Sequence, residues 1–399
     1  MEFLYDGTGN KISIQPKSEI LEIKVWDLPK LYIVSDTPYT SVTKDSSTKG
    51  TLTYIDGKVE MDAIPVKYKL QGNASVHLAK KNLNLTFYAD PEYGSKQKVK
   101  FGAWYPTSKI HIKANEQEYS MCRNSVSARI FHEWMGKNLP NGAMGYVDSF
   151  PCILYYNGEW MGCYTINLPQ ESALFNFDEA RETACEHLAY RISNVTNMSS
   201  VDSWEYRGDA DVTDEMNAKF QALLDVLYDT DNLTREIVES HIDIDSLLNY
   251  LVCAQIGNTG DNVHNNQTIA TWDGVKWYYI WYDLDACFGT GQGGIAVGNN
   301  GDIYTGNTIA YNQFFVKAAE LYRTELAEHY AKIRSRYDIP AFVSNAFYAF
   351  QNKWGIQNID ADRVKWAEDK STSTRDVDMI QDWLTARISW CDTYFGYTG

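Results

Sequence analysis

The spacing of hydrophobic positions changes once along this chain, and the change divides it into two parts. Between residues 29 and 168, short runs of alternating apolar and polar residues are separated by turns, a pattern that predicts β-strands. Asp56-Gly57 and Asn157-Gly158 are dipeptides that favour tight hairpin turns. One segment of this part, residues 120–137, has apolar residues at helical spacing and predicts a helix.

From residue 169 onward the apolar spacing is mainly that of helices. A buried helix is expected over residues 243–257, with Asp245 as its N-cap. A polar loop follows it, and then a predicted hairpin over residues 267–285 that turns at Asp273-Gly274. Four further helical stretches are expected after a Gly-rich loop at residues 289–302.

These patterns together predict an α+β protein with two lobes. Residues 1–28 are expected to form an N-terminal extension, residues 29–168 a β-rich lobe with one helix, and residues 169–399 a mainly helical lobe that carries the second hairpin. Two packed lobes commonly leave a cleft between them, and clefts of this kind are where ligands bind.

The composition narrows the classes of partner. The net charge of −16 disfavours a nucleic-acid surface, although it would attract a basic protein substrate. The seven cysteines show no C-x-x-C spacing, so buried free thiols are expected. No apolar run reaches about 18 residues, so no membrane helix is expected. The start MEFLYDGTGNKISIQ lacks the pattern of a signal peptide, which predicts a location in the cytosol or in a particle assembled there, such as a spore or virion.

Two polar clusters flank the second hairpin, GDNVHNN before it and DLD at its end. Pairing of the hairpin strands should bring Asn266 and the preceding Asp261 close to Asp283 and Asp285. Oxygen ligands that meet at a strand end suit Mg²⁺ or Mn²⁺, and a cation would relieve the repulsion between two carboxylates on one face of an extended strand. The alternative is that these residues cap a loop and end a strand in solvent.

Asp261 and Asn266 lie five residues apart, which is the D-x-x-x-x-N spacing of a protein-kinase catalytic loop. In such a site Asp261 would orient or deprotonate the acceptor hydroxyl, while Asn266 and Asp283 or Asp285 would hold the metal on the phosphates of ATP. The chain has no H-R-D at this loop, and Phe288-Gly289 follows Asp285 too late to complete a D-F-G.

A phosphate site also needs cations and backbone N–H groups, and the segment GNASVHLAKKNLNLTF offers both. Its two adjacent lysines occupy successive positions of an apparent strand, so one of them should point inward. The arginine that opens the helix after residue 120 could reach phosphate or an acidic neighbour. Solvated lysines on an edge strand and an ordinary turn are the alternatives. The candidates for nucleotide binding are Gly72, Asn73, Ser75, Lys80, Lys81 and Arg123.

Five segments resemble, in order, those of a known family. They are LPKLYIVSD with KGTLTYIDG, LQGNASVHLAKKNLNLTF, SMCRNSVSARIF, CILYYNGEWMGCYTI and GDNVHNNQTIATWDGVKWYYIWYDLDACFG. They resemble the opening strands, the G-R-G-N-S…P-K-K segment, the R-N-K-L-A-Y helix, the N-G-E-Y-x-G-x-Y hairpin and the W-D-x-D core of the CotH family, the spore-coat-protein-H-like atypical protein kinases. The resemblance covers about residues 29–340.

The resemblance implies an atypical protein-kinase-like fold, binding of ATP with Mg²⁺ or Mn²⁺, and phosphorylation of Ser-rich proteins, so that a Ser-rich, basic protein is the expected partner. This chain departs from the family at residues 70–74, LQGNA, where a Gly and an Arg are missing, and after the first-half hairpin, where Asn167-Leu168 replaces the usual Glu. Carried over by position, the site residues are Lys81 or Lys80 for the phosphates, Asp261 for catalysis, and Asn266, Asp283 and Asp285 for the metal.

Two other interpretations stay open. The same fold could serve as a non-catalytic structural or binding component, for example of a phage or spore particle. Alternatively, the three aspartates could act as the paired carboxylates of a carbohydrate-active protein, with Trp277 and Trp281 as stacking platforms. ATP-dependent transfer to a protein distinguishes the kinase from both.

Overall fold

The computed structural model describes residues 4–5, 11–12, 20–25, 28–72, 74–116, 118–291, 294–304, 312–367 and 377–399. The chain forms two compact units. Unit 1 comprises Met1–Lys113 and Pro151–Ile166, and unit 2 comprises Ala114–Phe150 and Asn167–Gly399.

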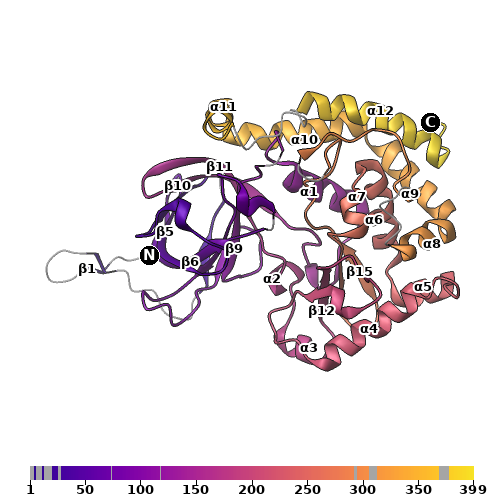
Figure 1. Ribbon diagram of the computed structural model, residues 1–399, viewed down its shortest axis with the longest axis horizontal. Coiled ribbons are helices and arrows are strands. Elements are labelled where there is room, and N and C mark those ends of the chain that lie inside the picture. Colours follow the sequence, from indigo (N-terminus) through magenta and orange to yellow (C-terminus); the bar gives the residue numbers. More distant parts are fainter. Residues whose placement is uncertain are drawn as a thin grey trace. The chain divides into compact units, whose positions relative to one another are not determined.

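Unit 1 is built on a closed β-barrel (Figure 1). The barrel closes where β10 pairs in parallel with β4, with Leu154 opposite Leu31. Strand alternation places one set of apolar side chains inside, and Leu31, Leu52 and Leu85 are fully buried. In barrel order the strands are β10 (Ser149–Tyr156), β11 (Glu159–Asn167), β9 (Lys109–Lys113), β7 (Leu83–Phe87), β6 (Lys58–Leu70), β5 (Thr48–Asp56) and β4 (Lys30–Val34).

Both hairpins predicted in this part are confirmed. Asp56 pairs with Lys58 around Gly57, whose φ is +72°. Asn157 and Gly158 both have positive φ, +49° and +82°, which is the conformation that Asn-Gly provides at little cost. The remaining elements of unit 1 are β1 (Leu4–Tyr5), β2 (Lys11–Ile12), β3 (Leu21–Ile23), β8 (Val99–Phe101) and the short 3₁₀ turns Tyr39–Ser41 and Ala74–His77.

Unit 2 is mainly helical and contains a four-stranded antiparallel sheet in the order β13 (Trp204–Tyr206), β12 (Leu188–Ile192), β14 (Thr268–Thr271) and β15 (Trp277–Ile280). Its longer helices include α1 (Arg123–Met135), α4 (Asp214–Tyr228), α6 (Ile244–Gly257), α9 (Arg323–Arg336), α10 (Ile339–Trp354) and α12 (Val377–Phe395). The shorter helices are α2 (Ser172–Phe175), α3 (Glu179–Thr183), α5 (Arg235–His241), α7 (Gly260–His264), α8 (Gln313–Leu321) and α11 (Ile356–Lys365), with 3₁₀ turns at Pro140–Gly142 and Val201–Ser203.

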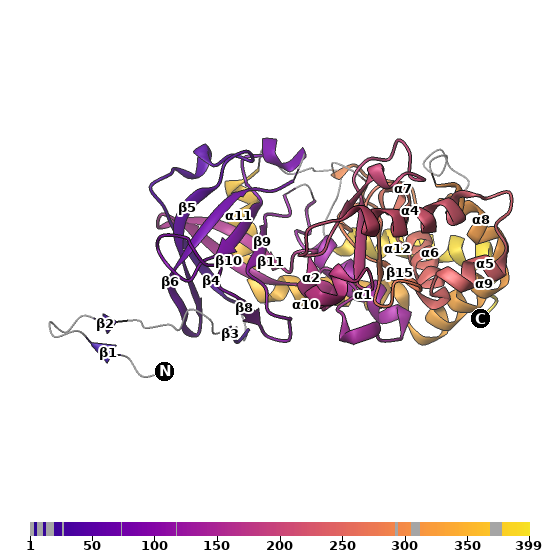
Figure 2. The same ribbon diagram turned by 90° about the horizontal axis from the view of Figure 1, so that it is seen from below.

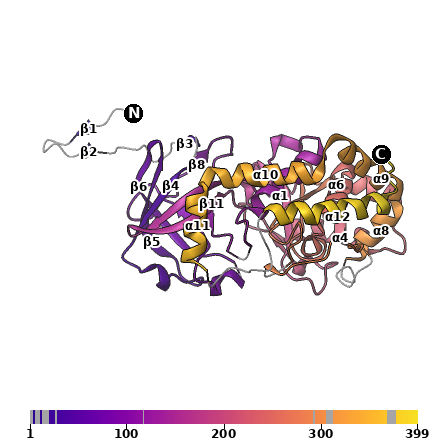
Figure 3. The same cartoon turned by 90° about the horizontal axis from the view of Figure 1, so that it is seen from above.

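Helix α6 is the centre of unit 2. Its sequence is apolar on nearly all sides, so the helix is buried almost throughout, as expected for a helix without a polar face. It contacts α1, α9, α12 and β15, and Figure 2 shows β15 beside it. Helices α10 and α12 run side by side in the same unit (Figure 3).

The elements confirm a mixed α+β protein with a β-barrel-rich N-terminal half and a helical C-terminal region. Helix α1, which was predicted within the β-rich lobe over residues 29–168, is grouped with unit 2. Its contact with α6 explains this placement, since the Asn249 side chain of α6 donates to the Phe131 carbonyl at 2.9 Å. The boundaries at residues 28 and 168 stay predictions.

Two details of the helical part differ from the predictions. The N-cap of α6 is Asp243 rather than Asp245, because the Asp243 carboxylate accepts the N–H of Ser246 at 2.9 Å. Among the described residues, five helices rather than four follow the Gly-rich loop.

The structure also bears on two further expectations, about the cysteines and about membrane helices. All seven cysteines are buried and free, as predicted. Burial raises the pKa of the Cys122, Cys152 and Cys253 thiols well above the usual value, which keeps them protonated. Among the described residues, none of the helices combines the length and the apolar character that a membrane crossing requires.

Candidate active site

Asp261 lies on a short helix that begins just after the buried helix α6. Helix α6 ends at Gly257 because Asn258 adopts a left-handed conformation, φ +51°, and its N–H bonds back to the end of the helix. The chain then reverses into α7, which contains Asp261. The predicted polar loop is therefore partly helical, and it starts directly after the buried helix α6.

The carboxylate of Asp261 is held by two side-chain amides. Asn266 Nδ2 donates to Oδ2 at 2.7 Å and Asn265 Nδ2 donates to Oδ1 at 3.3 Å. The backbone N–H groups of Asn265 and Asn266 also bond to the Asp261 carbonyl, at 2.8 and 3.1 Å. The two residues of the D-x-x-x-x-N spacing are thus in direct contact. Because a carboxylate only accepts, the Asn266 amide nitrogen faces Asp261, and its carbonyl oxygen is the atom that could ligate a metal.

The D-L-D segment, residues 283–285, does not continue the strand. β15 ends at Ile280, and Asp283 has a left-handed conformation with φ +54°. The expectation that Asp283 and Asp285 share one face of an extended strand is therefore wrong. Aspartate is among the few residues that adopt this conformation readily, so Asp283 itself turns the chain out of the sheet.

Asn124 of α1 fixes this turn. Its Nδ2 donates to Asp283 Oδ1 at 3.3 Å, and its Oδ1 accepts the N–H of Leu284 at 3.0 Å. One amide thereby binds both the side chain of Asp283 and the next peptide group. The sequence analysis did not identify Asn124 as a candidate site residue. The signal was its position directly after Arg123, in the R-N pair of the segment that resembles a helix of the family.

Hairpin register brings the two polar clusters to one end of the sheet, as predicted. Thr268, two residues after Asn266, lies opposite Ile280, two residues before Tyr282. The Asn262 side chain donates to the Tyr282 carbonyl at 2.7 Å and joins α7 directly to the residue before Asp283. The Tyr250 hydroxyl of α6 in turn donates to the Asn262 carbonyl at 2.7 Å.

Arg123 is buried at the start of α1, where its Nη1 donates to the carbonyls of Cys287 and Phe288, each at 2.8 Å. Its Nε lies 3.5 Å from Glu118, which is the acidic neighbour that the sequence allowed. These contacts fix the chain just after the D-L-D segment. The predicted contact of Arg123 with phosphate stays a prediction.

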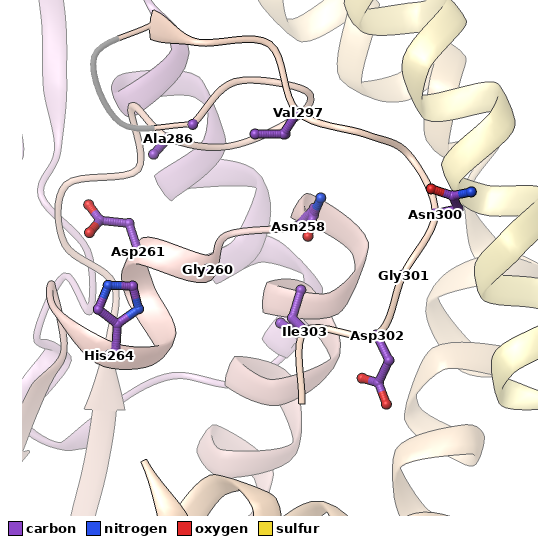
Figure 4. A pocket seen from close by; sticks show the side chains of 11 residues that line it. Asn258, Gly260, Asp261, His264, Ala286, Val297, Asn300, Gly301, Asp302 and Ile303 are labelled. Atoms are coloured by element: carbon purple, nitrogen blue, oxygen red, sulfur yellow. The ribbon is translucent and has the colours of Figure 1, made fainter. Parts of the chain in front are cut away.

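A cavity of about 500 Å³ opens beside Asp261 (Figure 4). Its walls come from the α6–α7 junction with Asp261, from Ala286 just after the D-L-D segment, and from described residues of the Gly-rich loop, among them Gly291, Val297 and Asp302. Helix α12 holds that loop in place, because Trp383 Nε1 donates to the Val297 carbonyl at 3.0 Å and Arg387 Nη1 donates to the Gly301 carbonyl at 2.9 Å.

The predicted metal ligands are all oxygen atoms, the donor type that a hard divalent cation prefers. Among the described residues, no three His, Cys, Asp or Glu side chains form a metal-binding group. The carboxylates of the D-L-D segment and the Asn266 carbonyl oxygen stay the predicted metal ligands, with the phosphates of a substrate as the remaining ones. Mg²⁺ is usually bound in this way, through few carboxylates and substrate phosphates.

The remaining candidates lie in unit 1. Lys80 is the lysine that points inward, since it is fully buried, and its Nζ donates to the Cys163 carbonyl at 2.7 Å and lies 4.7 Å from the centre of the Tyr164 ring. Lys81 is half-buried, with its Nζ donating to the Val76 carbonyl at 2.8 Å. Neither lysine is in a strand as predicted, because β7 begins only at Leu83.

Gly72 and Ser75 form a tight turn before the lysines. Gly72 has a φ of +106°, and a Cβ there would overlap Ser75 Oγ. That oxygen donates to the Gln71 carbonyl at 3.3 Å and accepts from Asn82 Nδ2 at 3.0 Å. Asn73, the third residue predicted in this turn, lies outside the described residues.

We expect Gly72→Ala to destabilise unit 1 by about 1–3 kcal/mol, because Ala disfavours positive φ and displaces Ser75 from its two hydrogen bonds. Gly57→Ala is the matched control, since Gly57 has a φ of +72° with no atom within 4 Å of the added Cβ. Urea unfolding of both variants would measure the difference. Equal losses would show that the contact with Ser75 adds nothing to the backbone effect.

The carbohydrate interpretation loses its stacking platforms. Trp277 and Trp281 are buried, with 2% and 3% of their surfaces exposed. The Trp281 ring stacks on Tyr250 with centroids 4.0 Å apart, inside the core of unit 2. These rings have no free face for a sugar, so the prediction that they bind one is wrong.

Comparison with known proteins identifies the family of the chain. No curated protein matches the chain. The family model described as CotH kinase protein matches residues 68–391, a range that contains every candidate residue named above. This chain therefore belongs to the CotH kinase protein family.

Proposed function

We propose that this protein is a protein kinase that transfers the γ-phosphoryl group of ATP to a Ser or Thr hydroxyl, with Mg²⁺ or Mn²⁺ as cofactor. The observation that carries the proposal is the position of Asp261. Its carboxylate is oriented by Asn265 and Asn266 on the wall of an open cavity, in a chain of a kinase family. A carboxylate in such a position can accept a proton from a hydroxyl that enters the cavity.

In the proposed reaction the acceptor oxygen forms a bond to the γ-phosphorus while the bond from that phosphorus to the β–γ bridging oxygen breaks, and ADP leaves. The hydroxyl proton passes to Asp261. A divalent cation held by Asp283, Asp285 and Asn266 would supply charge neutralisation on the phosphates. The family resemblance assigns phosphate contacts to Lys81 or Lys80, and the turn at Gly72 and Ser75 is a further candidate because it could present backbone N–H groups.

A basic, Ser-rich protein is the proposed acceptor. Asp261 and Asp302 give the cavity a negative lining, and no Lys or Arg is among its described lining residues. The net charge of −16 acts in the same direction over the whole molecule. A Lys or Arg beside the acceptor hydroxyl would therefore be attracted to this cavity.

The test is calorimetric titration of the full chain with ATP in Mg²⁺, in Mn²⁺ and in EDTA, followed by transfer from γ-labelled ATP to a basic Ser-rich protein. Metal-dependent binding and labelled Ser or Thr are the expected results. Absence of ATP binding with either metal would contradict the proposal and favour a non-catalytic component on the same fold.

A further inference from the structure

Arg191 places a positive charge next to the D-L-D segment. It lies on β12, opposite Glu205 on one side and Thr268 on the other. Thr268 in turn lies opposite Ile280 of β15, so Arg191 is at the same end of the sheet as Tyr282. The guanidinium carbon is 4.9 Å from the centre of the Tyr282 ring, which directly precedes Asp283.

The charge of Arg191 is only partly neutralised by protein. Its Nη2 donates to Glu205 at 2.7 Å, but the same carboxylate accepts from Arg207 Nη1 at 2.9 Å. Two guanidinium groups thus share one carboxylate. The Nε of Arg191 is buried and has no acceptor among the described residues. Since 21% of the side chain is exposed while Nε is buried and Nη2 is bonded, Nη1 is the atom positioned to meet an anion.

The surrounding charges act on this guanidinium. Burial lowers the pKa of Arg191, but Tyr282, Glu205 and Asp283 outweigh that effect and raise the pKa above its ordinary value. The contact with Tyr282, the residue before Asp283, places the guanidinium beside the D-L-D segment. An ATP molecule at the D-L-D segment would bring more negative charge than one divalent cation neutralises, so a further cation at this end of the sheet would strengthen binding.

We propose that Arg191 is a nucleotide-contacting residue, whose guanidinium binds a phosphate oxygen of ATP beside the D-L-D segment. The inference rests on the proposed kinase function. The Tyr282 ring would support one face of the guanidinium, and the hydrogen bond to Glu205 would fix its orientation. Arg191 does not line the cavity beside Asp261, which favours the nucleotide over the protein acceptor as its ligand.

The test compares binding of a non-hydrolysable ATP analogue and of adenosine to the full chain in Mg²⁺. Arg191→Gln should weaken binding of the analogue by about 10- to 100-fold, the range expected for a hydrogen bond to a charged group, and leave adenosine binding unchanged. Arg191→Lys keeps the charge but not the planar fork, so an intermediate loss is expected. Arg336→Gln is the matched control, because Arg336 also lies over a tyrosine ring, 5.2 Å from the centre of Tyr337, but on the exposed surface of α9.

Each outcome decides between the two proposals. If wild type binds the analogue and Arg191→Gln binds it equally well, the inference fails while the kinase proposal stands. Unchanged nucleotide binding together with slower transfer would assign Arg191 to binding of the acceptor. That result would also overturn the inference while the kinase proposal stands. Equal losses for the analogue and adenosine would indicate a structural role only. Absence of binding to the wild type would overturn the kinase proposal and this inference together.

Discussion

Asp261→Asn is expected to lower phosphoryl transfer by about 10²- to 10⁴-fold, the usual contribution of a general base, while ATP affinity stays within about threefold of wild type. The amide cannot accept the hydroxyl proton, yet it has nearly the same shape. Binding persists because the phosphates and the cation are assigned to other residues. Initial rates with γ-labelled ATP, measured beside calorimetric ATP binding, would separate the two effects.

The new amide keeps only one acceptor oxygen, so it loses the bond from either Asn265 or Asn266. A thermal unfolding curve should therefore accompany the rates, to exclude loss of folded protein. Asp382→Asn is the matched control, because Asp382 is an exposed aspartate on α12. Transfer by Asp261→Asn at close to the wild-type rate would remove Asp261 from the catalytic role.

Asp283→Asn should abolish most of the metal-dependent part of ATP binding. Loss of a residue that only supports a metal ligand usually lowers metal affinity by roughly 10- to 100-fold. Loss of a carboxylate that binds the metal directly should lower it at least as much. Asparagine is preferable to alanine here because Asp283 has a φ of +54°, a conformation that asparagine adopts and alanine disfavours. Calorimetry in Mg²⁺ and in EDTA should give similar ATP affinities for this variant and clearly different ones for wild type.

Asn124→Ala provides a graded comparison for Asp283→Asn. It leaves the carboxylate but removes its bond and the support of the Leu284 N–H. A smaller loss of metal-dependent binding is expected from it than from Asp283→Asn. If Asp283→Asn retains the full difference between Mg²⁺ and EDTA, the metal is not held by Asp283.

Much of the local structure follows from short-range chemistry in the sequence. Asn157-Gly158 specifies its hairpin, since few other pairs accept positive φ at adjacent positions, and Gly57 supplies the positive φ of the other turn. The register of the β14–β15 hairpin follows from the Asp273-Gly274 turn and the apolar strands, and it brings Asn266 to the end where the D-L-D segment begins. The approach of the two polar clusters at this end of the sheet could be predicted for that reason.

The conformation of the D-L-D segment could not be predicted in this way. Its residues continue a strand pattern, but Asn124, which is 159 positions away from Asp283 in the sequence, binds Asp283 and Leu284 and fixes the turn. Arg123 likewise secures Cys287 and Phe288 over a similar separation. No local pattern encodes such pairings, because they depend on how α1 packs beside α6.

The sequence alone therefore determined most of the helices and strands, the hairpin turns and the membership of the CotH kinase protein family, because turn chemistry, apolar period and motifs are each encoded within short segments. Only the tertiary structure decided which lysine is buried, where Asp283 turns and that Arg191 faces Tyr282. Each of these features depends on contacts between segments that are far apart in the chain. The local pattern of the sequence does not contain information about such contacts.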